Sequence, residues 1–343
     1  MRVCDWIANY VYSQGVKRIH GLTGGGAMGL NDGFIKHPEL DYIAYHHEQG
    51  AGHAAIGESK FTGLPSVVNP TTGCGGTNCI TSVLNAWQDS VPVIFISGNV
   101  KLGNCSRWIN KTRKTNIRKL GVQEHDIIET VQSITKKAFF VTSMYRVAEV
   151  LEEAFYVAMQ GRPGPVWIDI PADIQTQLMP TGYLHYKPPQ LINQQNFNKN
   201  KIIQILHNSQ RPIVLAGYGI RQSNTVSDFI RFIETFNIPY VSTYGSRDYL
   251  PFDHILNIGT VGIKGSRAGN FALQNADVLL VLGSSLGTSV TGYDAKQFNP
   301  RCNKIIVDVD EDELNKDIIL IDYKVNCDLR TFFTEMLCND QNG

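Results

Sequence analysis

Short apolar runs typical of β-strands alternate with helical patterns in two separate series, and this alternation restricts the fold more than any other feature of the sequence. The first series contains strand-like runs at residues 17–22, 41–46, 65–69, 92–98 and 164–171. The second series contains runs at residues 211–219, 238–245, 277–285 and 303–310. Strands that alternate with helices form parallel sheets covered on both faces. Each series therefore predicts an open α/β domain.

A polar segment separates the two series. Residues 176–198 contain Pro180, Pro188 and Pro189 among several Asn and Gln residues, which is the composition of a linker. A chain of 343 residues with 43% hydrophobic content can bury two cores. We therefore predict a first domain at 1–175, a linker at 176–198 and a second domain at 199–338. The polar last residues, CNDQNG, are predicted to fray.

Composition excludes several classes of partner. The 31 basic and 31 acidic residues balance, so no net charge attracts nucleic acid or an anionic membrane. Seven scattered cysteines without a C-x-x-C pair predict reduced thiols and no metal site. Polar residues interrupt the apolar N-terminus, and no run reaches the roughly 18 apolar residues of a membrane span. We therefore expect a soluble, cytoplasmic protein with small-molecule or protein partners.

The first glycine-rich turn permits two interpretations. Gly24, Gly26 and Gly29 have the spacing G-x-G-x-x-G, and Glu48 follows about where a dinucleotide-binding fold places its ribose-binding acid. The same glycines are equally compatible with a turn that only needs conformational freedom. The motif alone therefore does not decide whether a nucleotide binds here.

The residues after Glu48 argue against a single nicotinamide site. The helix predicted from Glu48 has almost no side-chain bulk along residues 50–57, so it must pack very closely against a neighbour. Residues 71–78, TTGCGGTN, form a second glycine-rich turn before a helix that Thr77 or Asn78 could cap. One nicotinamide site does not need both turns.

Several longer stretches resemble one enzyme family. Residues 46–55 are similar to its R-H-E-Q-G-A-x-H-A-A motif, and residues 71–98 to its T-S-G-P-G-x-x-N segment through D-S-x-P. Residues 161–175 resemble its G-R-P-G-P-V-x-x-D-I-P-x-D motif. These motifs belong to thiamine-diphosphate enzymes of the acetolactate synthase and benzoylformate decarboxylase type. The stretches that resemble the family's central domain are residues 211–220, 276–287 and 303–316. The resemblance replaces the nicotinamide interpretation.

The resemblance implies a role for several residues in thiamine diphosphate binding. Glu48 matches the family's catalytic glutamate, which hydrogen-bonds N1′ of the cofactor's aminopyrimidine and favours its imino tautomer. The glycine loop would lie beside the cofactor and the TTGCGGTN turn would line the pyrimidine pocket. Asn78 would contact the cofactor or cap a helix. The residues expected to bind the cofactor are Gly24, Gly25, Gly26, Glu48, Thr72, Gly73 and Asn78.

The expected substrate is a 2-oxo acid. Gln123 matches the glutamine of a family F-Q-E segment that reaches the substrate region, whereas Val122 replaces the usual Phe. The stretch before it is strongly basic and forms either a solvated loop or a funnel for anionic 2-oxo acids. Its basic residues are Arg107, Lys111, Arg113, Lys114, Arg118 and Lys119.

One part of the family pattern is absent from the sequence. The family holds Mg²⁺ and the diphosphate through a G-D-G motif in a third domain, and these 343 residues contain no Gly-Asp-Gly. The chain is thus expected to be truncated, one part of a split enzyme with a separate diphosphate-binding subunit, or a non-catalytic cofactor-binding or subunit-interaction protein. For an enzyme, the resemblance implies decarboxylation of a 2-oxo acid with carboligation in a homodimer or homotetramer.

A nucleotide in the second domain is a further possibility. Some members of the family bind FAD there through an R-F-D-D-R stretch, but residues 283–293 read GSSLGTSVTGY, which makes FAD doubtful. Residues Ser266 to Gly269 could still begin a helix that binds an anion.

Overall fold

In the computed structural model, which describes residues 1–190 and 197–338, the strand-like runs pair into two separate parallel sheets. The chain divides into two units, Met1–Gln190 and Leu191–Gly343. This division falls inside the segment predicted as a linker. Residues 176–190 nevertheless pack with the first unit; for example, the Leu184 amide donates to the Tyr145 carbonyl at 2.9 Å.

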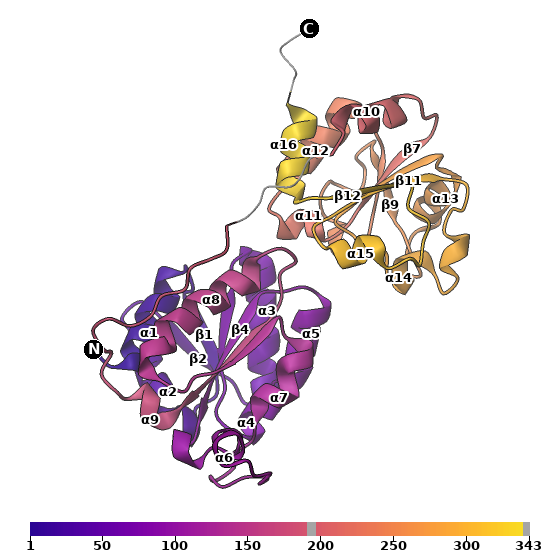
Figure 1. Ribbon diagram of the computed structural model, residues 1–343. Coiled ribbons are helices and arrows are strands. Elements are labelled where there is room, and N and C mark those ends of the chain that lie inside the picture. The colour runs from indigo at the N-terminus through magenta and orange to yellow at the C-terminus, as the bar shows by residue number, and fades with distance from the viewer. Residues whose placement is uncertain (191–196, 339–343) are drawn as a thin grey trace. The chain divides into compact units, whose positions relative to one another are not determined.

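The first unit contains a six-stranded sheet with the strand order β2-β1-β3-β4-β6-β5. Its strands are β1 (Arg18–Gly21), β2 (Asp41–Ala44), β3 (Ser66–Asn69), β4 (Val93–Asn99), β5 (Lys137–Phe140) and β6 (Val166–Pro171). Its helices are α1 (Val3–Ser13), α2 (Met28–Lys36), α3 (Glu48–Thr62), α4 (Cys74–Thr77), α5 (Ile80–Gln88), α6 (Ser106–Arg113), α7 (Ile127–Val131), α8 (Val147–Met159) and α9 (Ala172–Gln175). Figure 1 shows α1, α2 and α8 on one side of the sheet and α3, α5 and α7 on the other.

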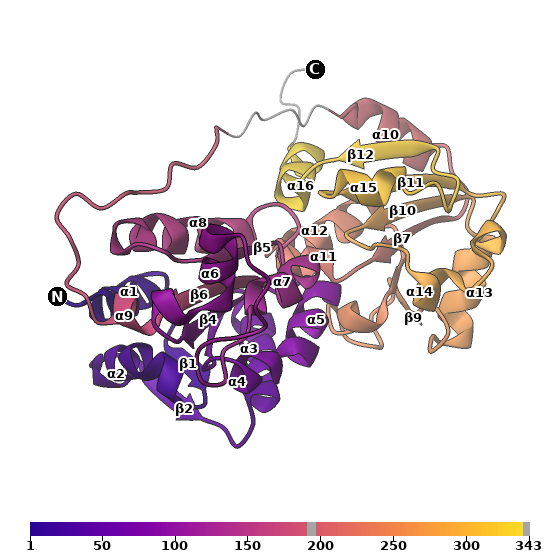
Figure 2. The same ribbon diagram turned by 60° about the horizontal axis from the view of Figure 1, so that its bottom comes forward.

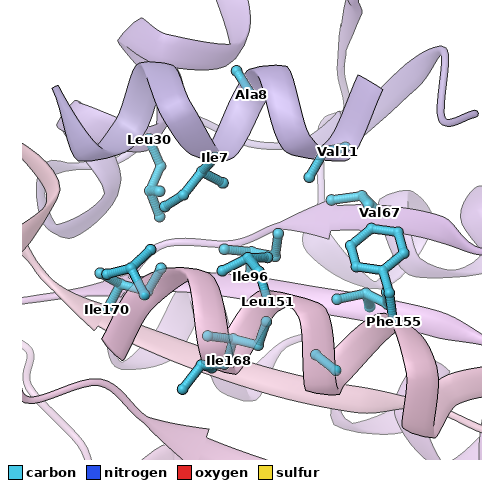
Figure 3. Close-up of a cluster of buried hydrophobic side chains, with 14 of the residues drawn as sticks. Ile7, Ala8, Val11, Leu30, Val67, Ile96, Leu151, Phe155, Ile168 and Ile170 are labelled. Atoms are coloured by element: carbon cyan, nitrogen blue, oxygen red, sulfur yellow. The ribbon is translucent and has the colours of Figure 1, made fainter. Parts of the chain in front are cut away.

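Alternating side chains of the strands fill two cores, one on each face of this sheet. In β4, Ile94 and Ile96 face the core beneath α1, α2 and α8, whereas Val93 and Phe95 face the core beneath α3, α5 and α7. Figure 3 shows the first of these cores, in which side chains of α1 and α8 meet those of the sheet. Burial on both faces explains why the central strands read as nearly continuous apolar runs.

The strand order places a topological switch point between β1 and β3. The chain moves from β1 outward to β2, and then returns to place β3 on the other side of β1. Gly21, the last residue of β1, lies in register with Ala44 of β2 and Asn69 of β3. Ligands of open α/β sheets bind where such strands end. The segments that follow β1, β2 and β3 therefore begin side by side, at the carboxyl ends of these strands, and form the candidate site.

The second unit contains another six-stranded parallel sheet, with the order β12-β11-β10-β7-β8-β9. Its strands are β7 (Pro212–Ala216), β8 (Tyr240–Ser242), β9 (Asn257–Thr260), β10 (Val278–Leu282), β11 (Asn303–Asp308) and β12 (Tyr323–Asn326). Its helices are α10 (Lys199–His207), α11 (Gly219–Gln222), α12 (Val226–Phe236), α13 (Arg267–Asn275), α14 (Thr288–Thr291), α15 (Glu311–Asn315) and α16 (Leu329–Leu337). Figure 2 shows this sheet from β12 through β11 and β10 to β7.

The fold class predicted from the sequence, two open parallel-sheet α/β domains, is confirmed. Three strands that the sequence did not predict, β5, β9 and β12, all lie at sheet edges. The prediction of fraying concerns residues 338–343. Of these, only Cys338 is among the described residues. None of the described helices is both long and apolar enough to cross a membrane.

Candidate cofactor site

Glu48 is the first residue of α3 and is only 6% exposed. His47 caps the helix, because its Nδ1 accepts a hydrogen bond from the Gln49 amide at 3.2 Å. Asn78 Nδ2 donates to Glu48 Oε2 at 2.9 Å. Glu48 Oε1 has no hydrogen-bond partner in the part of the chain that the structure describes. The site thus contains a buried carboxylate with one oxygen held by the protein and one available to a donor from a ligand.

Two glycines allow α3, which begins at Glu48, to pack closely against α4 and α5. A Cβ atom added at Gly75 would lie 3.0 Å from Glu48 Oε1 and 2.5 Å from Thr71 Cγ2. A Cβ added at Gly52, one turn after Glu48 in α3, would lie 2.0 Å from the Ser82 hydroxyl of α5. This is the close packing that the small residues of α3 predict.

The loops after β1 and β3 contact each other through the glycine loop. A Cβ at Gly24 would lie 2.5 Å from Thr71 Cγ2, and one at Gly26 would lie 2.9 Å from Thr72 Cβ. The Gly26 amide also donates to the Thr71 hydroxyl at 3.2 Å. A Cβ at Gly25, in contrast, would have no atom within 4 Å. Within this loop, Gly25 borders open space.

A buried polar network fixes the turn after β3. The Thr72 hydroxyl donates to Asn99 Oδ1 at 2.9 Å, and Asn99 Nδ2 donates to Asp169 Oδ2 at 2.7 Å. The Ser97 hydroxyl donates to Asp169 Oδ1 at 2.7 Å and accepts from Trp167 Nε1 at 2.8 Å. Burial raises the pKa of the Asp169 carboxyl to about 6, although both hydrogen bonds act in the opposite direction. Sequence reasoning did not single out Asn99 or Asp169, although a charged residue inside the buried run of β6 was the available signal.

Gln123 reaches this turn through its backbone. Gly73 has φ +62°, and a Cβ there would lie 1.6 Å from the Gln123 carbonyl oxygen, so only glycine fits. Gln123 itself has φ +56° and is exposed, and its neighbour Val122 is 80% exposed. The structure therefore brings Gln123 beside the same turn as Thr72 and Gly73.

Comparison with known families identifies the two domains of this chain. Residues 1–129 match the family model described as "Thiamine pyrophosphate enzyme, N-terminal TPP binding domain". Residues 199–336 match the one described as "Thiamine pyrophosphate enzyme, central domain". The chain belongs to the thiamine pyrophosphate enzyme family. The resemblance recognised from the sequence motifs is thereby confirmed.

Several members of the thiamine pyrophosphate enzyme family are similar along most of this chain. The acetolactate synthase large subunit of Lactococcus lactis is 33% identical over 331 residues, which are 94% of this chain and 54% of that protein. The isozyme 2 large subunit of Escherichia coli K12 is 32% identical over 323 residues, with 92% and 55% covered. The chloroplastic acetolactate synthase of Arabidopsis thaliana is 30% identical over 323 residues, with 91% and 45% covered. The chain spans about half the length of these curated relatives.

The expected capping role of Thr77 or Asn78 is wrong for this thiamine pyrophosphate enzyme domain. Helix α5 begins at Ile80, and Cys79 occupies its N-cap position without a side-chain cap. The Thr77 hydroxyl donates to the Cys74 carbonyl at 3.1 Å. Asn78 has helical backbone angles, because α4 leads almost directly into α5. Its side-chain amide donates to the Glu48 carboxylate instead of capping α5.

The central domain contains a hollow of about 620 Å³ beyond the ends of β8 and β9. Tyr244, Arg247 and Ser266 are among its lining residues. Ser266 caps α13, since its hydroxyl accepts from the Gly269 amide at 3.0 Å. Residues Ser266 to Gly269 thus do begin a helix, but the Gly269 amide is already satisfied by the protein.

In residues 1–190 and 197–338, the site contains neither a disulfide nor a cluster of metal-ligating side chains. All seven cysteines are free. Burial raises the pKa of the Cys79 thiol, which lies beside the Glu48 backbone. Within residues 1–190 and 197–338, no group of three or more His, Cys, Asp or Glu side chains could hold a metal ion.

Proposed function

We propose that this chain provides the pyrimidine-binding and central domains of an enzyme that uses thiamine diphosphate to decarboxylate a 2-oxo acid and join the product to a second carbonyl compound. The observation that supports the proposal best is the buried Glu48 carboxylate with its available Oε1. The similarity to acetolactate synthase large subunits supports the class of reaction.

The residues at the edge of the first sheet fit the pyrimidine end of the cofactor. Glu48 Oε1 would share a proton with the ring nitrogen N1′, and the Asn78 amide would hold the other carboxylate oxygen. The open space at Gly25 and the backbone of Thr72 and Gly73 would border the ring. When bound, the cofactor supplies the nucleophilic carbon and the electron sink for decarboxylation. Gln123 would contact the substrate.

Other parts of the complete enzyme are inferred from the family. Mg²⁺ and the diphosphate would be held by a domain with a Gly-Asp-Gly motif, which these 343 residues do not contain. That domain would belong to the same type of subunit in a homodimer or homotetramer, or to a separate subunit. FAD is not part of the proposal, because residues 283–293 lack the charged stretch that would bind it. We expect the enzyme to be cytoplasmic.

Replacement of Glu48 tests this function. The Glu48→Gln variant, assembled with the Gly-Asp-Gly domain, is expected to lose at least about 100-fold in kcat/KM for release of CO₂ from 2-oxo acids, because Gln cannot share the proton. The exposed Glu39 supplies a matched control, and Glu39→Gln should keep full activity. Unchanged CO₂ release in Glu48→Gln would contradict the proposal. Cofactor binding without CO₂ release from any 2-oxo acid by the wild type would favour a non-catalytic protein.

A further inference from the structure

A cationic loop beside the candidate cofactor site carries more positive charge than a simple 2-oxo acid requires. We define this cationic loop as residues 106–124. Five of its basic residues are exposed: Lys111, Arg113, Lys114, Arg118 and Lys119. Within the described parts of the chain, no carboxylate oxygen lies within 4.0 Å of their cationic nitrogens. Arg107 differs from them, because it pairs with Asp126 at 2.9 Å.

The cationic loop is held in shape by buried polar contacts. Glu124 is 5% exposed, and its Oε1 accepts from the Ser106 amide at 2.8 Å and the Ser106 hydroxyl at 2.5 Å. Its Oε2 accepts from the Leu120 amide at 3.3 Å. The Asn110 side chain bonds to both backbone groups of Ile117, at 2.8 and 3.0 Å. The loop therefore doubles back on itself and brings residues 111–114 and 118–119 to one tip.

The cationic loop lies at the carboxyl ends of the strands of the first sheet, where the candidate site also lies. The Gln123 carbonyl packs against Gly73, and a Cβ at Gly121 would lie 2.7 Å from Val100 Cγ2, just after β4. Figure 1 shows α6, whose last turn carries Lys111 and Arg113, at the same end of the first unit as α4. A ligand that approaches Gln123 therefore enters the field of the cationic loop.

We propose that the cationic loop binds the phosphate or diphosphate group of a phosphorylated carbonyl acceptor, an inference that rests on the function proposed above. A 2-oxo acid carries one carboxylate, which one cation can neutralise, whereas five unpaired cations at one tip repel each other. A diphosphate carries several charges and accepts many hydrogen bonds, including bidentate ones from arginine. The cationic loop contains a single aromatic side chain, Trp108, and none within residues 109–121. This disfavours a single-stranded nucleic acid, whose successive bases stack on several aromatic side chains.

Binding of inorganic pyrophosphate to the 343-residue chain tests the proposal by isothermal titration calorimetry. The wild type should bind pyrophosphate, and the affinity should fall as salt is added. The variant Lys111→Gln/Arg113→Gln/Lys114→Gln should bind at least about tenfold more weakly, because it loses three of the five cations. A control with the same charge change combines Lys187→Gln, Lys296→Gln and Arg301→Gln at exposed positions outside the cationic loop and should bind like the wild type.

The outcomes separate this inference from the proposed function. Glu48→Gln should bind pyrophosphate as the wild type does, because Glu48 is outside the cationic loop. No pyrophosphate binding, or equal weakening in the control variant, would overturn the inference even if Glu48-dependent CO₂ release persisted. Tighter binding of a single-stranded oligonucleotide than of pyrophosphate would also overturn it. Pyrophosphate binding that depends on the loop, together with unchanged CO₂ release in Glu48→Gln, would overturn the proposed function and leave only an anion site.

Discussion

The Glu48 carboxylate is held by an amide that is 30 positions away in the sequence. The family motif predicts that Glu48 activates the cofactor, and the run of small residues after it predicts close packing. The contact with Asn78 could not be predicted, because it depends on the backbone angles at the junction of α4 and α5. The same holds for Asp169, whose partners Ser97 and Asn99 come from β4 and are aligned with it only when β4 and β6 pair.

Loss of the Asn78 amide should destabilise the first unit. Asn78→Ala removes the hydrogen bond to Glu48 Oε2 and leaves a buried carboxylate less well satisfied, so the free energy of unfolding should fall by about 1–3 kcal/mol. Urea denaturation followed by circular dichroism measures this change. Thr77→Val, which removes a hydrogen bond between neutral groups, should cost less. An equal fall in the free energy of unfolding of both variants would mean that the hydrogen bond from Asn78 to Glu48 stabilises the fold no more than the one from Thr77 does.

Asp169 should make stability depend on pH. Its pKa is raised from an ordinary value of 3.8 to about 6, so the folded protein binds this proton more tightly than the unfolded chain does. The resulting stabilisation is fully present below pH 3.8 and is lost as the pH rises through about 6. From about pH 4 to about pH 7, the free energy of unfolding of the wild type should fall by roughly 2.4 kcal/mol relative to Asp169→Asn. Urea denaturation at several pH values provides the measurement, and a rise in this difference would contradict the assignment.

Among the elements, the central strands could be predicted from the sequence and several edge strands could not. Central strands such as β4 and β10 are buried along their whole length and therefore read as continuous apolar runs. The unpredicted β5, β9 and β12 each pair with one neighbour and bury few of their residues. Their short, partly polar sequences resemble loops until a neighbouring strand provides the hydrogen bonds. Likewise, the sequence predicts a glycine-rich turn over residues 71–78, whereas the structure forms the short helix α4 within it.

Helix α3 should tolerate a methyl group at Gly57 but not at Gly52. Gly52→Ala would place a Cβ 2.0 Å from the Ser82 hydroxyl and should lower the free energy of unfolding by about 1–3 kcal/mol, despite alanine's better helix propensity. Gly57→Ala in the same helix meets no atom within 4 Å and should raise it by about 0.5–1 kcal/mol. Both values come from chemical denaturation.

A second substitution tests whether the Ser82 contact is the cause. Replacement of Ser82 by glycine in the Gly52→Ala background removes the clashing hydroxyl and should restore part of the lost stability. If the double variant is instead less stable than Gly52→Ala by the full cost of Ser82→Gly alone, the clash is not the cause of the loss.

The whole molecule consists of two units, each with its own hydrophobic cores. The cores of Met1–Gln190 and those of Leu191–Gly343 share no residues among the described positions. The sequence predicts this division, since a polar segment separates the two alternating series. It also identifies the family but not the substrate. The family motifs do not explain why Val122 stands where the family usually has Phe, and they do not include the cationic loop.

Separate cores imply that the first unit folds without the second. A fragment of residues 1–190 should show helical and strand circular dichroism and unfold cooperatively in urea, because it contains both cores of its sheet. A fragment that ends at residue 175 should be less stable, since residues 176–190 pack on this unit. A disordered 1–190 fragment would show that the first unit depends on the rest of the chain.

The position of the cofactor's pyrimidine ring relative to Glu48 decides whether this carboxylate activates the cofactor. A crystal structure of the enzyme with thiamine diphosphate and Mg²⁺ should place ring nitrogen N1′ within about 2.6–3.2 Å of Glu48 Oε1, with Asn78 still bound to Oε2. A ring bound elsewhere, or a Glu48 carboxylate turned away from N1′ toward solvent, would contradict the account.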